Sequence, residues 1–428
     1  MSPSTRPSTE DHRPPSTADE PPGAPALLGA FPRNFLVPFP RKGEAIGRDD
    51  IAAAGHTDSK MSTVHVRCGA GRNGFWIEDA GSRNGTFVDG QRLPPHERVE
   101  LSDGAVVRMA VTIFVFRTAY RGDSKPARPL GRLVGPWGLG SLHGALARLP
   151  RLSRAPINVL IEGATGVGKE LLAPEVVNRL GRDPRRLATI NVASFPESMF
   201  DAQLFGWERG AFSGAVQSSR GVFREYHGGS VFLDEIGELP PSLQPKLLRL
   251  LENREVWSIG ASRAEQVDLA ILGATNRSLE AMVRSRDFRA DLLARFPIRV
   301  SIPPLEERPE DLHAISAALW ERRFGPLDLS RTRVDAEAVE RMMLHDWPAN
   351  VRDLDRLLAT VDPASGLKLS TVHAFFGERA PVSDPLLTKE AIAQAMSACG
   401  GNQSAAARRL GINRPKLRRE LKKHGIQG

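Results

Sequence analysis

The sequence has very little cysteine and no long apolar run. Cys68 and Cys399 are its only cysteines, and they lie far apart without the spacing of metal ligands. This argues against a disulfide framework or a zinc site and fits a reducing compartment. No segment approaches the ~18 consecutive apolar residues of a membrane helix. The N-terminus carries Pro, Ser and Thr where a signal peptide is apolar. We therefore expect a cytoplasmic protein with no membrane partner.

The positive charge of the chain is concentrated at its C-terminal end. The 428 residues carry a net charge of +8, and their hydrophobic content of 41% is that of a globular protein of about three domains. Residues 400–428 contain eight Lys and Arg but a single acid, Glu420, which gives this segment +7 of the total. A solvated helix usually mixes the two signs. This one-sided charge indicates a polyanionic partner, for which double-stranded DNA is the best candidate.

Composition divides the chain into several segments. Residues 1–30 are poor in large apolar side chains, so we expect a disordered tail there. Short strand-like runs over residues 31–118 predict an all-β sandwich. A linker at 119–130 leads to a region, up to residue 376, where apolar strands alternate with helical stretches, which predicts an α/β domain with a parallel sheet. A linker at 377–384 and a helical segment at 385–428 follow.

A phosphate-binding loop is predicted where an apolar strand runs into a glycine-rich turn and then a helix. Its glycines let backbone N–H groups surround phosphate oxygens, the helix N-terminus adds its dipole, and a lysine adds a charge. The last position holds an acid where this type of loop usually has a hydroxyl ligand for Mg²⁺. A turn that merely joins strand and helix is the alternative. The loop comprises Gly163, Ala164, Thr165, Gly166, Val167, Gly168, Lys169 and Glu170.

Two acids follow a second apolar strand. In a P-loop ATPase, an acid at the position of Asp234 holds Mg²⁺ and the next, here Glu235, polarises the attacking water. Such acids can also serve only to cap a helix, but Lys169 upstream favours the catalytic reading. A third strand ends at Asn276, a polar sensor for the γ-phosphate. The sequence therefore predicts ATP and Mg²⁺ as cofactors, with Asp234 as the metal ligand.

These motifs resemble the central AAA+ domain of bacterial enhancer-binding proteins, the activators of sigma-54 RNA polymerase. That family has Glu at the position of Glu170. The resemblance implies an α/β core at 131–303, a helical lid at 304–376 and an active homo-oligomer, from dimer to hexamer. It also implies contact with sigma-54 through a mobile surface loop, which in this chain consists of Gly210, Ala211, Phe212, Ser213, Gly214 and Ala215.

The same resemblance implies roles for four further residues. Arg289 and Arg295 are the candidates for arginine fingers that reach the ATP of a neighbouring subunit, Arg352 would reach the phosphates from the lid, and Asn191 would hold Glu235 in check. The chain also departs from the family. Ser213 replaces a Thr, Glu306 replaces an Arg, and Pro174 lies in the helix after the phosphate loop, where proline costs ~3 kcal/mol unless the helix bends.

The strand-rich front region resembles a forkhead-associated (FHA) domain, whose loops bind phosphothreonine. The resemblance rests on Gly47-Arg48, on Ser62 followed by His65, and on the run from Gly81 to Thr86. It implies phosphate contacts from Arg48, Ser62 and Arg83 and a grip on the ligand backbone by Asn84, while His65 braces the loops. Thr63 stands where the family usually has Arg. The ligand is expected to be a phosphothreonine protein or a phosphorylated segment of the chain's own tail.

The basic tail resembles the Fis-type helix-turn-helix of the same activators. Helical spacing is interrupted at Leu410-Gly411-Ile412, so that a second short helix can enter the major groove. Such modules usually act as dimers. The basic residues expected to face DNA are Arg414, Lys416, Arg418, Arg419 and Lys422.

The leading hypothesis is an ATP-hydrolysing activator of sigma-54 RNA polymerase that binds upstream enhancer DNA and is regulated by phosphothreonine recognition. The alternative is a DNA-bound regulator or repressor whose ATPase serves assembly and no longer engages sigma-54. The departures at Pro174, Ser213 and Glu306 support that alternative. A third possibility is an AAA+ remodeller of some other protein, against which the Fis-type tail argues.

Overall fold

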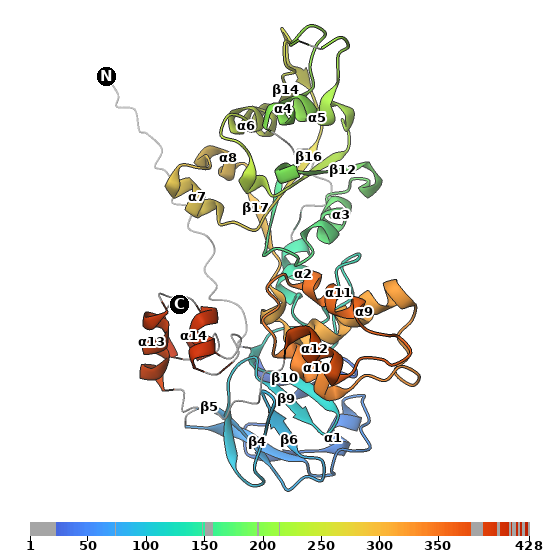
Figure 1. Cartoon of the computed structure of the whole chain (residues 1–428), viewed down its shortest axis with the longest axis vertical. Helices are drawn as coiled ribbons and strands as arrows, with labels where there is room; N and C mark the ends of the chain where they lie inside the picture. Colours follow the sequence, from blue (N-terminus) through green and yellow to red (C-terminus); the bar gives the residue numbers. More distant parts are fainter. Residues whose placement is uncertain are drawn as a thin grey trace, which may run out of the picture.

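The computed structural model describes residues 23–72, 74–147, 149, 157–194, 197–213, 215–377, 388–399 and 403–410, and positions 412, 417, 420–421 and 424–426. In this part of the chain a β-sandwich, an α/β domain, a helical lid and a small C-terminal helical unit follow one another (Figure 1). This confirms the multidomain architecture expected from the sequence. Among these residues, no helix combines the length and the apolar character that crossing a membrane requires.

The front domain consists of two antiparallel sheets. The first has the strand order β2-β1-β10-β9-β6-β7 and the second β3-β4-β5-β8, with the short helix α1 (Arg48–Ala53) beside them. Alternate side chains of both sheets form one buried core, which includes Phe35, Ile77 and Phe114. The strands are β1 (Ala24–Phe31), β2 (Phe35–Pro38), β3 (Glu44–Ile46), β4 (Val66–Gly71), β5 (Gly74–Asp79), β6 (Thr86–Val88), β7 (Gln91–Arg92), β8 (Arg98–Leu101), β9 (Val106–Met109) and β10 (Thr112–Tyr120).

Strand β1 corrects the expectation that residues 1–30 form a disordered tail. It pairs with β10 from Ala24 opposite Tyr120 to Phe31 opposite Ile113, and all its residues except Ala24 are buried. The sequence signal was weak because Pro25 and Gly29 interrupt the run and because the partner strand lies far away in the chain. Tertiary pairing decides this strand. Residues 1–22 lie outside the described residues.

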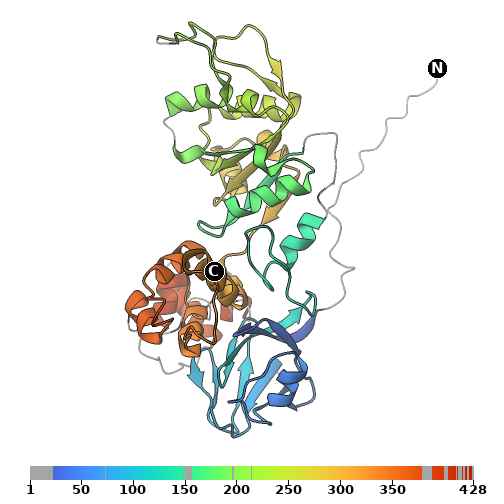
Figure 2. The same ribbon diagram turned by 90° about the vertical axis from the view of Figure 1, so that its right-hand side faces the viewer.

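The central domain is built on a parallel sheet of five strands in the order β12-β13-β16-β11-β17. Helices lie on both faces of the sheet, as parallel sheets require (Figures 1 and 2). The strands are β11 (Val159–Glu162), β12 (Leu187–Asn191), β13 (Ser230–Asp234), β16 (Ala270–Thr275) and β17 (Ile298–Ser301), and the helices are α2 (Gly140–Ala147), α3 (Lys169–Arg179), α4 (Glu197–Phe205), α5 (Gly221–Glu225), α6 (Gln244–Asn253), α7 (Leu279–Ser285) and α8 (Ala290–Ala294).

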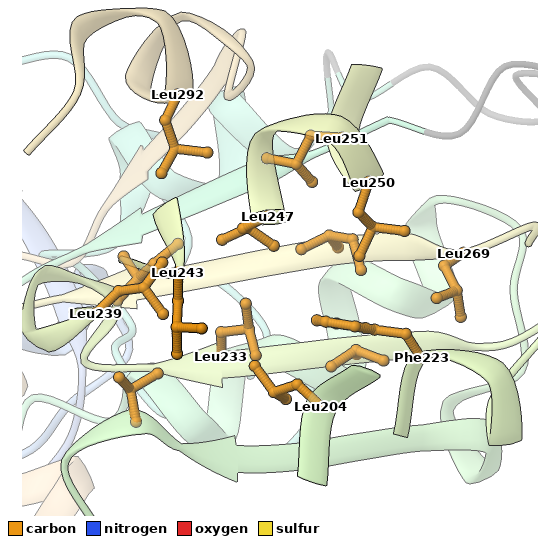
Figure 3. Close-up of a cluster of buried hydrophobic side chains, with 14 of the residues drawn as sticks. Leu204, Phe223, Leu233, Leu239, Leu243, Leu247, Leu250, Leu251, Leu269 and Leu292 are labelled. Carbon is orange, nitrogen blue, oxygen red and sulfur yellow. The ribbon is translucent and has the colours of Figure 1, made fainter. Parts of the chain in front are cut away.

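Leucines dominate the core on one face of this sheet. Leu247, Leu250 and Leu251 of α6 point toward the strands, where they meet Leu233 and Leu269 (Figure 3). Full burial of a leucine side chain contributes roughly 1.5–3 kcal/mol, so the leucines on this face hold α6 firmly against the sheet. On the other face, α3 continues past Pro174 and ends at Arg179. The helix therefore accommodates the proline without stopping there.

The lid consists of α9 (Leu312–Phe324), α10 (Ala336–Met343), α11 (Val351–Ala359) and α12 (Leu369–Phe376). These helices lie beside the β-sandwich in both views (Figures 1 and 2). In the C-terminal unit, α13 (Lys389–Ala398) begins at Thr388, whose side chain accepts a hydrogen bond from the Ala391 N–H. It packs against α14 (Gln403–Arg409) through a small apolar core that includes Leu417 and Leu421.

Candidate nucleotide site and its surroundings

The predicted phosphate loop lies at the carboxyl edge of the parallel sheet, between β11 and α3. It forms one wall of a cleft of about 670 Å³. Gly166 and Gly168 have φ values of 77° and 105°, which a residue with a side chain would adopt only with strain. Lys169 is almost fully buried, and its Nζ donates to the Gly163 carbonyl oxygen (2.9 Å). The local sequence thus presents a fixed cationic side chain and glycine backbone to the cleft.

Asp234 and Glu235 lie opposite this loop at the end of β13, and both line the cleft. Lys169 Nζ is 3.5 Å from Glu235 Oε1. Burial raises the pKa of Asp234, and the nearby charge of Glu235 raises it further, while Lys169 opposes the shift. Glu235 has φ 56° and ψ 49°, a left-handed conformation that is uncommon for Glu and that ends the extended backbone of β13. Sequence reasoning brought these three residues together, and the structure places them in one cleft.

This pair of acids fits Mg²⁺. Magnesium in nucleotide sites is usually held by one or two carboxylates together with substrate phosphates. Here Asp234 and Glu235 face a phosphate-binding loop, and their mutual repulsion is the kind that a cation relieves. Glu170, at the start of α3, also lines the cleft. Asp234 would hold the ion, which when bound would neutralise phosphate charge.

Asn276 connects the two walls. Its backbone N–H donates to Glu235 Oε2 (3.2 Å), and its side-chain Nδ2 donates to Thr165 Oγ1 (2.9 Å). Asn276 follows β16, the strand next to both β11 and β13, so sheet order alone brings it here. Asn276 therefore sits where a group can respond both to the phosphate loop and to Glu235.

Asn191 ends β12, and strand register sets it opposite Asp234. Its Oδ1 accepts a hydrogen bond from the Ala193 N–H (2.9 Å). In this conformation the side chain is engaged by the turn that follows β12. The structure thus places Asn191 one residue from Glu235 in register, and the role implied by resemblance stays a prediction.

The two candidate arginine fingers flank α8. Arg289 pairs with Asp291 (2.7 Å) and Arg295 with Glu252 (2.5 Å), and both guanidinium groups are about half exposed. The residues that line the cleft of the same chain include neither arginine. Both are therefore presented on the surface, where an adjacent subunit could meet them.

The lid closes the cleft from the other side. Arg352 lines it, as the resemblance implied, together with Val351 and Asp355 of α11. Asn350, which sequence reasoning missed, makes the direct connection. Its Nδ2 donates to the Thr165 carbonyl oxygen (3.0 Å) and its Oδ1 accepts from the Leu305 N–H (2.8 Å). Asn350 follows the turn Trp347-Pro348-Ala349 and has an unusual backbone conformation (φ 52°, ψ −130°), which no local propensity signals.

The cleft also has an apolar end that sequence reasoning did not identify. Leu133 and Val134 line it together with Ile315 and Leu319 of α9. These four side chains suit the flat apolar faces of a base, while the phosphate loop suits the opposite end of a nucleotide. A short apolar run directly after the expected linker at 119–130 was the available signal.

The predicted sigma-54 loop projects between α4 and α5. Trp207 and Ser219 exchange backbone hydrogen bonds (3.0 and 2.9 Å) and form its stem, and the Gly210 N–H donates to the Ala215 carbonyl oxygen (2.9 Å). Phe212 is 46% exposed, with its ring 5.7 Å from that of Trp207. A large apolar side chain is thus held at the tip of a loop. Ala211 and Ser213 flank it, and Gly214 lies outside the described residues.

The four predicted phosphothreonine-binding residues converge on loops at one end of the sandwich. The Arg48 guanidinium donates to the carbonyl oxygens of Met61 and Ser59, the Arg83 N–H donates to Ser62 Oγ (3.3 Å), and Asn84 Nδ2 donates to the Lys60 carbonyl oxygen (2.5 Å). These loops carry the polar groups that a phosphorylated side chain requires.

Two buried residues brace these loops. His65 is fully buried, accepts from the Ser62 N–H at Nδ1 (3.2 Å) and faces the Gly85 carbonyl oxygen with Nε2 (3.2 Å), which confirms the bracing role. Asp79, which sequence reasoning missed, accepts hydrogen bonds from Gly81, Ser82 and Thr86. Burial acts to raise the pKa of Asp79, but these hydrogen bonds outweigh burial and hold the pKa below its usual range.

The residues predicted to contact DNA all come from the last part of the chain. Arg414, Lys416, Arg418, Arg419 and Lys422 all lie outside the described residues. The described α14, the first helix of the expected helix-turn-helix, packs against the preceding α13.

Models of three known domain families match the front, central and C-terminal regions of the chain. A model of the FHA domain matches residues 45–110, a model of the sigma-54 interaction domain matches 140–301, and a model of the Fis family of bacterial regulatory proteins matches 387–424. The central domain is thus of the AAA+ ATPase type. The front match covers the loops that hold Arg48, and the central match covers the phosphate loop and the Phe212 loop.

The chain is similar to several regulators. It is 32% identical over 320 residues to the regulatory protein LuxO of Vibrio cholerae, covering 67% of this chain and 60% of LuxO. It is 37% identical over 300 residues to the phenol regulator MopR of Acinetobacter guillouiae, covering 64% and 53%. A solved structure of NtrX from Brucella abortus is 26% identical, with a TM-score of 0.49, and 69% of this chain and 70% of that one are covered.

The chain spans between 43% and 62% of the length of the curated relatives it matches. One polypeptide nevertheless carries, in order, an FHA domain, a sigma-54 interaction domain and a Fis-type helix-turn-helix. The central domain therefore belongs to the sigma-54 interaction domain family of bacterial transcriptional regulators.

Proposed function

We propose that this protein hydrolyses ATP to activate transcription by sigma-54 RNA polymerase from an upstream DNA site, under the control of phosphothreonine binding to its FHA domain. The observation that carries this proposal is the cleft itself. Lys169, Asp234, Glu235 and Arg352 line one cavity although they come from three separate parts of the chain. Hydrolysis of a bound nucleoside triphosphate is the function that this combination supports best.

Each residue in the cleft has a distinct task in this proposal. Lys169 and the glycine backbone hold the phosphates, and Glu235 accepts the proton of the attacking water. Asn276 binds both Glu235 and Thr165, so it can report the state of the γ-phosphate to the base. Arg352 adds positive charge from the lid. Asp234 would hold Mg²⁺.

Arg289 and Arg295 support an oligomeric enzyme. They are exposed on the surface of the α/β domain and outside the cleft of their own chain. If they stabilise the transferring phosphoryl group, that group belongs to a neighbour. A ring, most simply a hexamer, satisfies this requirement at every subunit.

The connectivity explains how hydrolysis would move the Phe212 loop. The loop is inserted between β12, which ends at Asn191, and β13, which ends at Asp234, and α4 and α5 flank it. A shift of these strands can therefore reach the loop along α4, which follows the carboxyl end of β12, and along α5, which precedes the amino end of β13.

The base of the loop is clamped by Arg224. This buried residue donates to the carbonyl oxygens of Arg220 (2.7 Å) and Ser219 (2.8 Å) and pairs with Glu265 of β15 (Glu265–Gln266). Because β15 pairs with β14 (Glu255–Val256), the clamp joins the loop to a second hairpin beside it. Phe212 would thus be displaced as part of a braced unit rather than as a flexible tip.

The test is sigma-54-dependent open-complex formation with purified components. Wild-type protein should melt a promoter that carries its DNA site when ATP is supplied. Lys169→Ala should abolish ATP hydrolysis and melting while DNA binding by the tail is retained. Hydrolysis by the wild type without promoter melting would favour the alternative regulator or repressor, and unchanged hydrolysis in Lys169→Ala would refute the assigned site.

A further inference from the structure

The outer face of the six-stranded FHA sheet is buried against the lid. Ala30 and Phe31 of β1, Val106 of β9, and Ile113 and Val115 of β10 belong to the same hydrophobic core as the lid helices. From the lid, this core includes Leu312, Ile315, Trp320, Val339 and Met343. The sandwich and the lid therefore share one core, unlike two domains that are joined only by a linker.

Two close ion pairs cross this interface. Arg108 Nε is 2.7 Å from Glu340 Oε2, with only 8% and 6% of the two side chains exposed. Arg117 Nη2 is 2.7 Å from Glu310 Oε2 and also donates to the Glu307 carbonyl oxygen. Removing one partner of such a buried pair leaves the other charge uncompensated, while the apolar core that the two surfaces share opposes their separation. The interface is built to stay closed.

Trp137 adds a third tie, which leads toward the nucleotide cleft. Its Nε1 donates to the Gly29 carbonyl oxygen of β1 (3.1 Å), and its backbone N–H donates to Asp311 Oδ1 (2.8 Å). Leu133 and Val134, a few residues earlier in the chain, line the cleft. The segment that leaves the sandwich is thus fixed to the sheet, to the lid and to the nucleotide site at once.

On the FHA side, Arg108 is in contact with the strand that follows the phosphothreonine loops. Its guanidinium lies over the Phe87 ring (3.7 Å to the centroid), and Phe87 follows Asn84 by three positions. Arg108 also donates to the Ala110 carbonyl oxygen, and the Ala110 N–H points to the Gly85 carbonyl oxygen (3.4 Å), which also faces His65. A ligand that tightens the loop at 82–85 therefore acts through Phe87 and Ala110 on Arg108, the residue that binds Glu340.

On the ATPase side, α9 connects the shared core to the cleft. The His313 ring packs edge-on against Phe31 of the sandwich (4.9 Å between centroids). Two residues along, Ile315 belongs to the shared core and also lines the nucleotide cleft. Leu319 and Arg322 of the same helix line the cleft as well. A tilt of the sandwich must displace α9, because close-packed cores transmit displacements.

From this continuity we propose that the FHA sandwich and the lid move as one body, so that phosphothreonine binding at Arg48, Ser62 and Asn84 and nucleotide binding in the cleft are thermodynamically coupled. The inference rests on the proposed function and names its regulation. Each ligand changes the affinity for the other by the same factor. We expect a factor of about 5 or more, the low end of typical allosteric coupling. The FHA domain then acts on the lid of its own chain, in contrast to a tethered module that only recruits a partner.

The first experiment uses the full chain and a non-hydrolysable ATP analogue. Hydrogen exchange should slow in β9 and in the loop at 82–85 when the analogue binds, although no part of these segments lines the cleft. Glu340→Gln should reduce that transmitted protection at least severalfold. Glu337→Gln is the matched control, since Glu337 lies on the same helix but is 61% exposed and 4.0 Å from Arg108. Protection confined to the cleft in wild-type protein would overturn the inference.

The second experiment measures a phosphothreonine peptide, selected from a randomised library, with and without the analogue. An affinity change of about 5-fold or more that Glu340→Gln abolishes supports the coupling. Peptide binding that ignores the nucleotide overturns the coupling but leaves the proposed sensor intact. If no phosphopeptide binds, the sensor is wrong, and the exchange experiment alone decides whether sandwich and lid are coupled. If the analogue does not bind, the proposed ATPase site itself is refuted, and with it the coupling.

Discussion

Asn350 offers the sharpest test of how the lid is fixed over the phosphate loop. Asn350→Ala removes two hydrogen bonds and leaves the buried Leu305 N–H without its acceptor, a loss of about 1–3 kcal/mol. Loss of the bond to the Thr165 carbonyl oxygen adds about 0.5–1.5 kcal/mol. The backbone strain at φ 52° persists with Ala. We expect lid docking to weaken by about 1.5–4.5 kcal/mol in total, from these two contributions.

Nucleotide affinity reports this loss because Arg352 and Val351 follow Asn350 into the cleft. If about 2 kcal/mol is transmitted, the dissociation constant of a fluorescent ATP analogue rises about 30-fold. Asn350→Gly loses the same bonds but relieves the strain, so it should be less impaired than Asn350→Ala. Arg356→Ala, an exposed change on the same helix, is the control. Wild-type affinity in Asn350→Ala would refute the docking role.

Two further predictions concern the front domain and its contact with the lid. Arg48→Ala should abolish the preference for phosphorylated over plain peptide, because it removes a phosphate donor and the hydrogen bonds to the Ser59 and Met61 carbonyl oxygens. Arg67→Ala, an exposed change on β4, should leave the preference intact. An equal preference in both variants would count against the site. Burial lowers the pKa of His313 from its usual value of 6.5 to about 4, so the unfolded chain binds more protons than the folded chain between these pH values. Stability contributed by neutral His313 should therefore decline as pH falls from 6.5 to 4. Burial raises the pKa of Asp311, so the contribution of Asp311 to stability changes with pH in the opposite direction. The quantity to measure is therefore the difference in denaturation midpoint between wild type and His313→Gln. A difference that does not vary with pH would contradict the assignment.

Local chemistry made the nucleotide site predictable from the sequence. The phosphate loop, Asp234, Glu235 and Asn276 each follow an apolar strand, and the carboxyl ends of neighbouring parallel strands meet at one edge. The loops that hold Arg48 and Asn84 were also predictable from the sequence, because three short motifs at characteristic spacing indicate that these loops form one binding site. Asn350 was missed because its role depends on a backbone conformation that propensities do not encode.

Long-range packing was beyond the reach of sequence reasoning. β1 was taken for part of a disordered tail because its partner β10 is distant in the chain. Arg108 and Glu340 are separated by 232 positions, and each alone resembles an ordinary surface charge. Their burial follows from the fit between a sheet face and a helix pair, which no local pattern reports. The interface between the sandwich and the lid therefore emerged only from the structure.

The central claim is that hydrolysis in the cleft displaces the Phe212 loop and that Phe212 transmits this displacement to sigma-54. Promoter melting by purified Phe212→Ala, compared with Val216→Ala, tests it most directly, because Val216 is 74% exposed on the same loop but lies beyond its tip. The account predicts that Phe212→Ala still hydrolyses ATP and binds DNA but does not open the promoter, whereas Val216→Ala does. Promoter opening by Phe212→Ala at the wild-type rate would contradict it.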